Sequence, residues 1–115
     1  MFNFFQRKPD PSQVTPEQIK ARQEAGERLY FLDVREAGEY AEGHIAGSTL
    51  VPLGQLSSRL GSLPNDRTIV AVCHSGSRSG VAVSLLRGAG FTNVLNLRGG
   101  MSGWARSGMP IKRGR

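Results

Sequence analysis

The sequence predicts an α/β domain with three layers, in which helices cover both faces of a mostly parallel sheet. Short apolar runs alternate along the chain with segments of helical pattern, and residues 29–34 and 68–73 are apolar at most positions. Strands buried on both faces have this composition, and helical crossovers join parallel strands. The 115 residues suffice for one compact domain.

The first elements follow from turn and capping residues. We expect residues 1–11 to form a flexible N-terminal lead, because Pro9-Asp10-Pro11 interrupts any regular element. The domain proper is predicted to span residues 12–107. Thr15-Pro16-Glu17-Gln18 has the form of a capping box with proline at the first helical position, and it predicts a helix up to Gly26.

The middle of the chain holds two strands and two helical segments. Residues 29–34 predict a buried strand, and residues 36–42 predict a short helix that Gly43 ends. A turn and a short strand follow, and Pro52 ends that strand because proline cannot donate to a ladder. Residues 53–60 then predict a further helix.

The last third repeats the alternation. Residues 68–73 are the strongest strand signal, residues 79–87 predict a helix, and residues 93–97 predict another strand. A glycine pair then turns the chain into a short helix that carries Trp104, which we expect in the core. Residues 108–115 are predicted to be a basic C-terminal tail that frays after Pro110.

Composition excludes several classes of protein. The longest apolar run has the length of a strand, so we expect no membrane span, and the start lacks a signal-peptide pattern, so we expect a cytoplasmic protein. One cysteine forms no internal disulfide, and with two histidines no metal site is predicted. The formal net charge of +6 comes from scattered basic residues without a nucleic-acid motif, which favours small anions over nucleic acid as partners.

Cys73 is the residue most indicative of chemistry. It is the last residue of the most apolar predicted strand, and ligands bind beyond the carboxyl ends of parallel strands. The small, glycine-containing segment that follows can curl with its N–H groups pointing inward, where the next helix dipole reinforces them. Such donors lower a thiol pKa and create a nucleophile, whereas a cysteine inside the strand would only pack.

We therefore predict that Cys73 is catalytic and that the loop after it binds substrate. Arg78 adds a positive charge, and its planar fork can hydrogen-bond loop carbonyls and oxygens of an anionic substrate together. For Asp33 and Arg35 we prefer a structural interpretation, in which they tie turns and helices together. The predicted substrate-binding residues are His74, Ser75, Gly76, Ser77 and Arg78.

Several short motifs are spread over most of the chain. They are Leu32-Asp33-Val34-Arg35-Glu36, Glu39-Tyr40, Gly43-His44-Ile45-Ala46-Gly47-Ser48, Val51-Pro52, Cys73-His74-Ser75-Gly76-Ser77-Arg78-Ser79, and Leu97-Arg98-Gly99-Gly100 through Trp104. With these motifs the sequence resembles the rhodanese (sulfurtransferase) family from about Ser12 to Trp104. The resemblance implies a rhodanese-like fold with a five-stranded parallel sheet, a turn-fixing role for His44, and a Cys73 that carries sulfur as a persulfide.

The resemblance implies a thiosulfate sulfurtransferase that needs no cofactor. Its partners would be a small anionic sulfur donor and an acceptor such as glutathione, a thioredoxin-like protein or cyanide. The alternative is a persulfide carrier or regulatory protein-binding module with little turnover of small molecules. An arsenate reductase or phosphatase is less favoured, because four residues separate Cys73 from Arg78 where the phosphatase signature has five.

Overall fold

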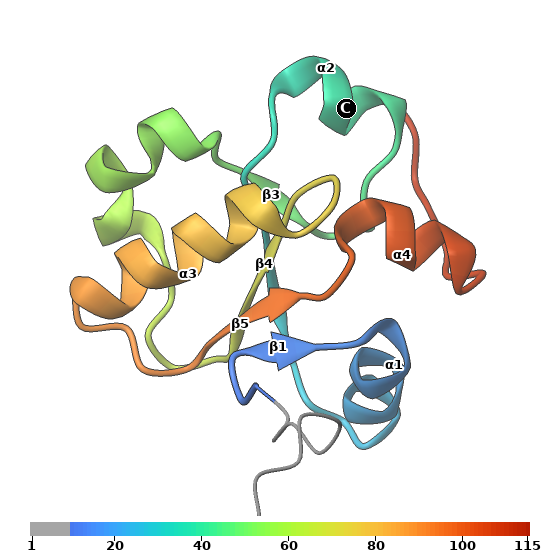
Figure 1. Ribbon diagram of the computed structural model, residues 1–115, viewed down its shortest axis with the longest axis horizontal. Helices are drawn as coiled ribbons and strands as arrows, with labels where there is room; N and C mark the ends of the chain where they lie inside the picture. Colours follow the sequence, from blue (N-terminus) through green and yellow to red (C-terminus); the bar gives the residue numbers. More distant parts are fainter. Residues whose placement is uncertain (1–9) are drawn as a thin grey trace, which may run out of the picture.

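The computed structural model describes residues 10–115, so most of the lead predicted for residues 1–11 lies outside the described residues. Its strands are β1 (Gln13–Val14), β2 (Tyr30–Asp33), β3 (Thr49–Leu50), β4 (Ile69–Val72) and β5 (Val94–Leu97). Its α-helices are α1 (Pro16–Glu24), α2 (Ala37–Glu42), α3 (Ser77–Gly88) and α4 (Gly100–Arg106). The strands form one five-stranded sheet in the order β1-β5-β4-β2-β3, and all of its pairs are parallel (Figure 1).

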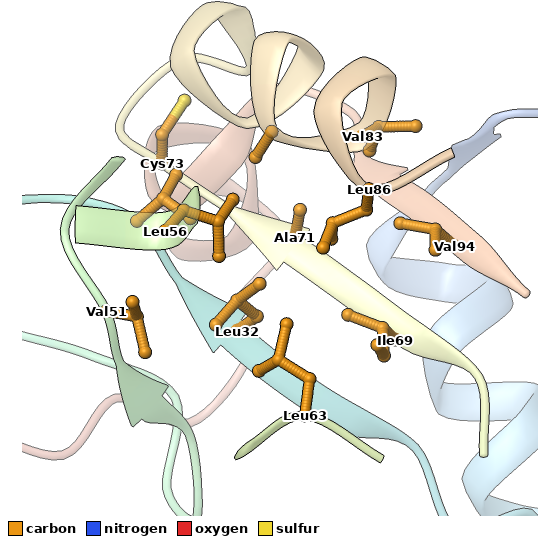
Figure 2. Close-up of a cluster of buried hydrophobic side chains, with 12 residues drawn as sticks. Leu32, Val51, Leu56, Leu63, Ile69, Ala71, Cys73, Val83, Leu86 and Val94 are labelled. Atoms are coloured by element: carbon orange, nitrogen blue, oxygen red, sulfur yellow. The ribbon is translucent and has the colours of Figure 1, made fainter. Parts of the chain in front are cut away.

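The core consists of two apolar clusters, one on each face of the sheet. Successive residues of β4 alternate between them, because side chains along a strand point to opposite faces. The first cluster packs α3 and the segment after β3 on the sheet (Figure 2), and it includes Leu32, Leu56, Leu63, Ile69, Ala71 and Leu86. The second packs α1 and α4 on the other face, and it includes Ile19, Phe31, Val70, Val72, Leu97 and Trp104.

Most predicted elements are present with small changes of boundary. The capping box is confirmed, since Gln18 N–H donates to Thr15 Oγ1 at 3.1 Å and Thr15 N–H donates to Gln18 Oε1 at 2.9 Å. Helix α3 begins at Ser77, two residues earlier than predicted, and the helix predicted for residues 53–60 is two 3₁₀ segments, Leu53–Ser58 and Leu60–Ser62.

Strand β1 was not predicted from the residue pattern. It has two residues, which is too short for an alternation to be recognised. It exists because it pairs with β5, where Gln13 lies opposite Asn96 and Val14 opposite Leu97. The fifth strand was therefore implied by the family resemblance alone.

The fraying predicted after Pro110 is wrong. Lys112 and His44 exchange two backbone hydrogen bonds of 2.8 Å, and Gly114 N–H donates to the carbonyl of Ala41 at 2.8 Å. The side chain of Ile111 packs on the second core cluster and on Gly43, where a Cβ would come within 2.9 Å of it. These contacts hold the last residues beside α2, as the red end of the ribbon shows (Figure 1).

The helices of residues 10–115 are short. The longest, α3, has 12 residues, whereas a membrane-spanning helix needs about 20 apolar residues. None of the helices in this part of the chain is long and apolar enough to cross a membrane.

Candidate active site

Cys73 lies directly after the central strand β4, where the chain turns into α3. Strands β5 and β2 flank β4, so the end of β4 lies near the middle of the carboxyl edge of the sheet. The Cys73 side chain is buried, with 1 % of the residue exposed, while His74, Ser75 and Ser77 are exposed. The structure thus places the predicted nucleophile at the base of an exposed loop.

Two donors contact the Cys73 sulfur directly. The backbone N–H of Gly76 points at Sγ with an N–S distance of 3.0 Å, and the Ser79 hydroxyl lies 3.3 Å from Sγ. Gly76 has φ of +106° and forms the N-cap of α3, a conformation that glycine adopts without strain and that turns its N–H inward. The sulfur therefore lies at the amino end of a 12-residue helix, where negative charge is favoured.

The environment of Cys73 lowers its pKa. Burial is the largest single influence, and it opposes ionisation of the thiol. The hydrogen bonds outweigh burial together: the Ser79 hydroxyl contributes most, followed by the backbone N–H groups of Ser79, Gly76 and Ser75. The pKa of Cys73 is consequently below its ordinary value, so the thiolate is stabilised relative to that of an ordinary cysteine.

Helix α4 holds the loop through hydrogen bonds to its backbone carbonyls. Met101 N–H donates to the Cys73 carbonyl at 2.8 Å, and Ser102 N–H donates to the His74 carbonyl at 3.0 Å. In a trans peptide the N–H points opposite to the carbonyl, so these bonds turn the following N–H groups away from α4. Gly100 has φ of +56°, and a Cβ there would collide with the carbonyl oxygens of Cys73 and His74.

Arg78 does not have the loop-carbonyl contacts predicted for it. Both of its terminal nitrogens donate to the carboxylate of Glu39 on α2, each at 2.8 Å, and within residues 10–115 it forms no hydrogen bond to a loop carbonyl. The hydrogen bond from Arg78 is the main cause that lowers the pKa of Glu39 to about 2, and the same bond raises the pKa of Arg78. Arg78 is therefore a cation in the first turn of α3 whose charge Glu39 largely balances.

Asp33, Arg35 and His44 have the structural roles expected of them. Arg35 donates to Asp33 through Nε at 2.9 Å and a terminal nitrogen at 2.8 Å, and it also donates to the Gly43 carbonyl at 2.7 Å. The His44 ring stacks on Tyr40 at 3.7 Å, and its Nδ1 lies 2.7 Å from the Tyr40 carbonyl oxygen. These contacts hold the end of α2, and with it the helix that carries Glu39.

A cleft of about 420 Å³ lies beside the loop. Helix α2, the loop, α4 and the C-terminal segment form its walls, and among the predicted site residues His74 lines it. A larger hollow of about 600 Å³ lies at the opposite edge of the sheet around Glu27 and Asp66, and none of the predicted site residues lines it. The cleft that His74 lines is therefore the better candidate for substrate access.

Three polar residues of the site were not among the predicted site residues. Ser79, which contacts the Cys73 sulfur, was expected only at the start of the helix. Glu39 carries no signal for its pairing with Arg78, which lies 39 residues away. Asn96 does carry one, because it is a polar residue within a strand whose other residues are apolar, and it is only 5 % exposed. Buried amides of this kind are hydrogen-bonded, and Asn96 contacts both Ser79 and Gly76.

Comparisons with known proteins agree with this geometry. Residues 15–107 match the family model of the rhodanese-like domain. The chain is 36 % identical over 100 residues to a sulfurtransferase of Allochromatium vinosum, covering 87 % of this chain and 94 % of that protein. It is 39 % identical over 103 residues to thiosulfate sulfurtransferase 16, chloroplastic, of Arabidopsis thaliana, covering 76 % of this chain and 82 % of the relative.

A solved structure supports the fold independently. A rhodanese-related protein from Thermoplasma volcanium superposes with a TM-score of 0.79 at 29 % identity, covering 87 % of this chain and 96 % of that one. Several other curated relatives are longer proteins, of which this chain spans half or less. The family model covers most of the chain, and the parallel sheet and the cysteine loop agree with it: the chain belongs to the rhodanese-like family of sulfurtransferases.

Proposed function

We propose that this protein transfers a sulfane sulfur from an anionic donor such as thiosulfate to a thiol or cyanide acceptor, with Cys73 as the nucleophile. One observation carries the proposal: the Cys73 sulfur is buried among hydrogen-bond donors that lower its pKa. A relative with a broad match is named a thiosulfate sulfurtransferase, which supports thiosulfate as the donor to test first.

The first half-reaction loads the sulfur. The Cys73 thiolate attacks the outer sulfur of thiosulfate, a new S–S bond forms, and the bond between the two sulfurs of the donor breaks. Sulfite leaves with the electron pair of that bond, so Cys73 becomes a persulfide anion and no oxidant or reductant is consumed. The Gly76 N–H and the Ser79 hydroxyl stabilise negative charge on the cysteine sulfur before attack.

The second half-reaction unloads the sulfur. A thiolate acceptor attacks the outer sulfur of the persulfide, the persulfide S–S bond breaks, and the Cys73 thiolate leaves with its electron pair. The acceptor carries away the sulfur as its own persulfide, or as thiocyanate when cyanide attacks. Each half-reaction requires Cys73 as an anion, and the loop donors favour that state.

The loop residues would share the binding of the donor and of the persulfide. Ser75 and Gly76 offer backbone N–H groups to the sulfur, and His74 and Ser77 lie exposed at the rim. Arg78 contributes a balanced charge at the start of α3 and connects the loop to α2. The exposed loop also suits acceptors that are themselves proteins.

Mass spectrometry of the thiosulfate-treated protein tests the proposal. We expect the mass to increase by one sulfur atom, the increase to disappear after reduction, and Cys73→Ser to abolish it. Because the chain has one cysteine, the assignment has no competing thiol. A Ser variant that still took up and transferred reducible sulfur would show that Cys73 is not the nucleophile.

A persulfide carrier that acts on a partner protein is the second candidate. It is favoured by the exposure of His74, Ser75 and Ser77, which a protein surface could approach. Steady-state release of sulfite with thiosulfate and cyanide separates the two functions. Turnover with these small molecules supports the enzyme, whereas a persulfide that forms only with a partner present supports the carrier.

A further inference from the structure

Asn96 has a buried carboxamide whose two ends contact the cysteine loop. Its Nδ2 donates to the Gly76 carbonyl at 3.0 Å and to Gln13 Oε1 at 3.3 Å. Its Oδ1 accepts a very short hydrogen bond from the Ser79 hydroxyl. Gly76 and Ser79 are also the two residues that contact the Cys73 sulfur, so one side chain holds both of them.

Chemistry determines the orientation of this carboxamide. The Gly76 carbonyl can only accept a hydrogen bond, so the NH₂ group of Asn96 must face it. Turning the carboxamide over would place two acceptor oxygens against each other at 3.0 Å. The oxygen of Asn96 therefore faces Ser79, which means that Ser79 contacts a group that can only accept.

The Ser79 hydroxyl has one proton and two possible acceptors for it. When Cys73 is a neutral thiol, the S–H can donate to Ser79 Oγ, and the Ser79 O–H donates to Asn96 Oδ1. When the sulfur is an anion, it accepts a charge-assisted hydrogen bond, which is about twice as strong as a neutral one. The hydroxyl proton then turns from Asn96 to the sulfur, and the oxygens of Ser79 and Asn96 move apart because no proton lies between them any longer.

We propose that Asn96 is a positioning residue that makes the Ser79 hydroxyl a two-way switch. While the Cys73 sulfur is protonated, the Ser79 hydroxyl donates its hydrogen bond to the neutral carboxamide of Asn96. When the sulfur becomes a thiolate or a persulfide anion, the hydroxyl donates to the sulfur instead. The switch is a rotation about one C–O bond, and no covalent bond changes. Only its persulfide state rests on the proposed function, since the thiol and thiolate states exist without sulfur transfer.

The neutrality of residue 96 is the testable part. In Asn96→Asp, a protonated carboxyl can still donate to the Gly76 carbonyl and accept from Ser79, so it imitates the carboxamide. Once ionised, the carboxylate keeps accepting the hydrogen bond of the Ser79 hydroxyl and repels the sulfur anion. It also loses the hydrogen bond that it donated to the Gly76 carbonyl. We expect the alkylation rate of Cys73 with iodoacetamide, relative to the wild type, to fall from near one at about pH 5 to about a tenth near pH 7.5.

Two further variants separate the switch from a structural role. Asn96→Ala removes the acceptor and adds no charge, so its rate relative to the wild type should not depend on pH. Gln13→Glu places a carboxylate against the same Nδ2, where it cannot take the Ser79 proton, and should change the rate much less than Asn96→Asp. In a Ser79→Ala background the effect of Asn96→Asp should shrink.

The other ionisable groups around the loop do not confuse this comparison. His74 and Arg78 belong to the loop, and Glu39 faces it from α2 through its ion pair with Arg78. All three are present in the wild type and in each variant, so a ratio of rates compares proteins with the same surrounding charges. The proposal would be overturned if the alkylation rate of Asn96→Asp relative to the wild type did not change with pH. It would also be overturned if Asn96→Ala reacted more slowly than Asn96→Asp at every pH.

A measurement on the wild type remains decisive if Asn96→Asp does not fold. The ¹³C resonance of the Asn96 carboxamide should shift with the same midpoint as the alkylation profile of Cys73, because the carbonyl loses its donor when the sulfur ionises. Exposed Asn65 and Asn93 provide internal references that should not move. A ¹³C shift of Asn96 that does not change with pH would refute the switch. Neither the alkylation measurement nor the ¹³C measurement depends on persulfide formation.

Discussion

Arg78, in the first turn of α3, donates both terminal nitrogens to the two carboxylate oxygens of Glu39 on α2, each at 2.8 Å. This bidentate pair connects the cysteine loop to a helix on the far side of the candidate cleft. Its side chains are partly exposed, at 38 % and 36 %, so solvent weakens its contribution to stability. The effect of the Arg78–Glu39 pair on the charge around the Cys73 sulfur is therefore more important than its contribution to stability.

Removing Arg78 alone should slow sulfur uptake. Arg78→Ala leaves Glu39 as an unbalanced anion beside the site, where it repels a dianionic donor, and we expect persulfide formation from thiosulfate to slow by about tenfold or more. The double variant Arg78→Ala with Glu39→Gln should regain part of the loading rate. Arg78→Lys should lose less of the rate than Arg78→Ala, because lysine keeps the positive charge although it lacks the planar guanidinium group. Pre-steady-state loading at two ionic strengths measures these differences, which salt should reduce.

The release of sulfur to a neutral thiol supplies the control for Arg78. That step involves no dianionic donor, so Arg78→Ala should slow it less than it slows loading. If all variants loaded at one rate without salt dependence, the backbone N–H groups alone would account for binding, and Arg78 would only begin α3.

The Glu39 carboxyl should make a small, pH-dependent contribution to stability. Its pKa of about 2 in the folded protein lies below the ordinary 4.5, so its contribution is fully present above pH 4.5 and is lost as the pH falls towards 2. For a partly exposed pair we expect less than about 1 kcal/mol. The unfolding free energies of the wild type and Glu39→Gln should therefore converge at low pH in denaturant titrations, whereas a constant difference would argue against the pair.

The length of the loop should restrict the chemistry. Four residues separate Cys73 from Arg78, and inserting one between Gly76 and Arg78 enlarges the ring of donors around the sulfur. We expect the insertion to slow persulfide formation, and we expect the unmodified protein to have negligible aryl phosphatase activity. Hydrolysis of an aryl phosphate by the unmodified protein at a rate comparable to sulfur transfer would contradict the argument from loop size.

A side chain at Gly100 should destabilise the protein. Its φ is positive, and a Cβ would meet the carbonyls of Cys73 and His74, so Gly100→Ala combines backbone strain with overpacking. Gly108→Ala is the matched control, because Gly108 also has a positive φ of 73°, but among residues 10–115 nothing lies within 4 Å of the place its Cβ would take. We expect the first substitution to cost about 1–3 kcal/mol more than the second. Equal unfolding free energies would show that α4 does not hold the loop tightly.

Much of the fold and the position of the proposed nucleophile follow from local sequence features. The Thr15 capping box, the apolar run that ends at Cys73 and the small loop after it each depend on neighbouring residues, and all three are found in the structure. The periodicity of apolar residues determines which faces are buried, so four of the five strands could be predicted. The lowered pKa of Cys73 also agrees with the prediction that N–H groups of the loop face its sulfur.

Tertiary structure alone decided the contacts between distant segments. Arg78 meets Glu39 because the crossovers bring α2 and α3 to the same edge of the sheet, and Asn96 reaches Gly76 because β5 lies beside β4. The strand Gln13–Val14 and the pairing of Lys112 with His44 likewise need a partner to exist. A backbone segment this short lacks a periodicity of its own, since what stabilises it is a hydrogen-bonding edge supplied by residues far away in the chain.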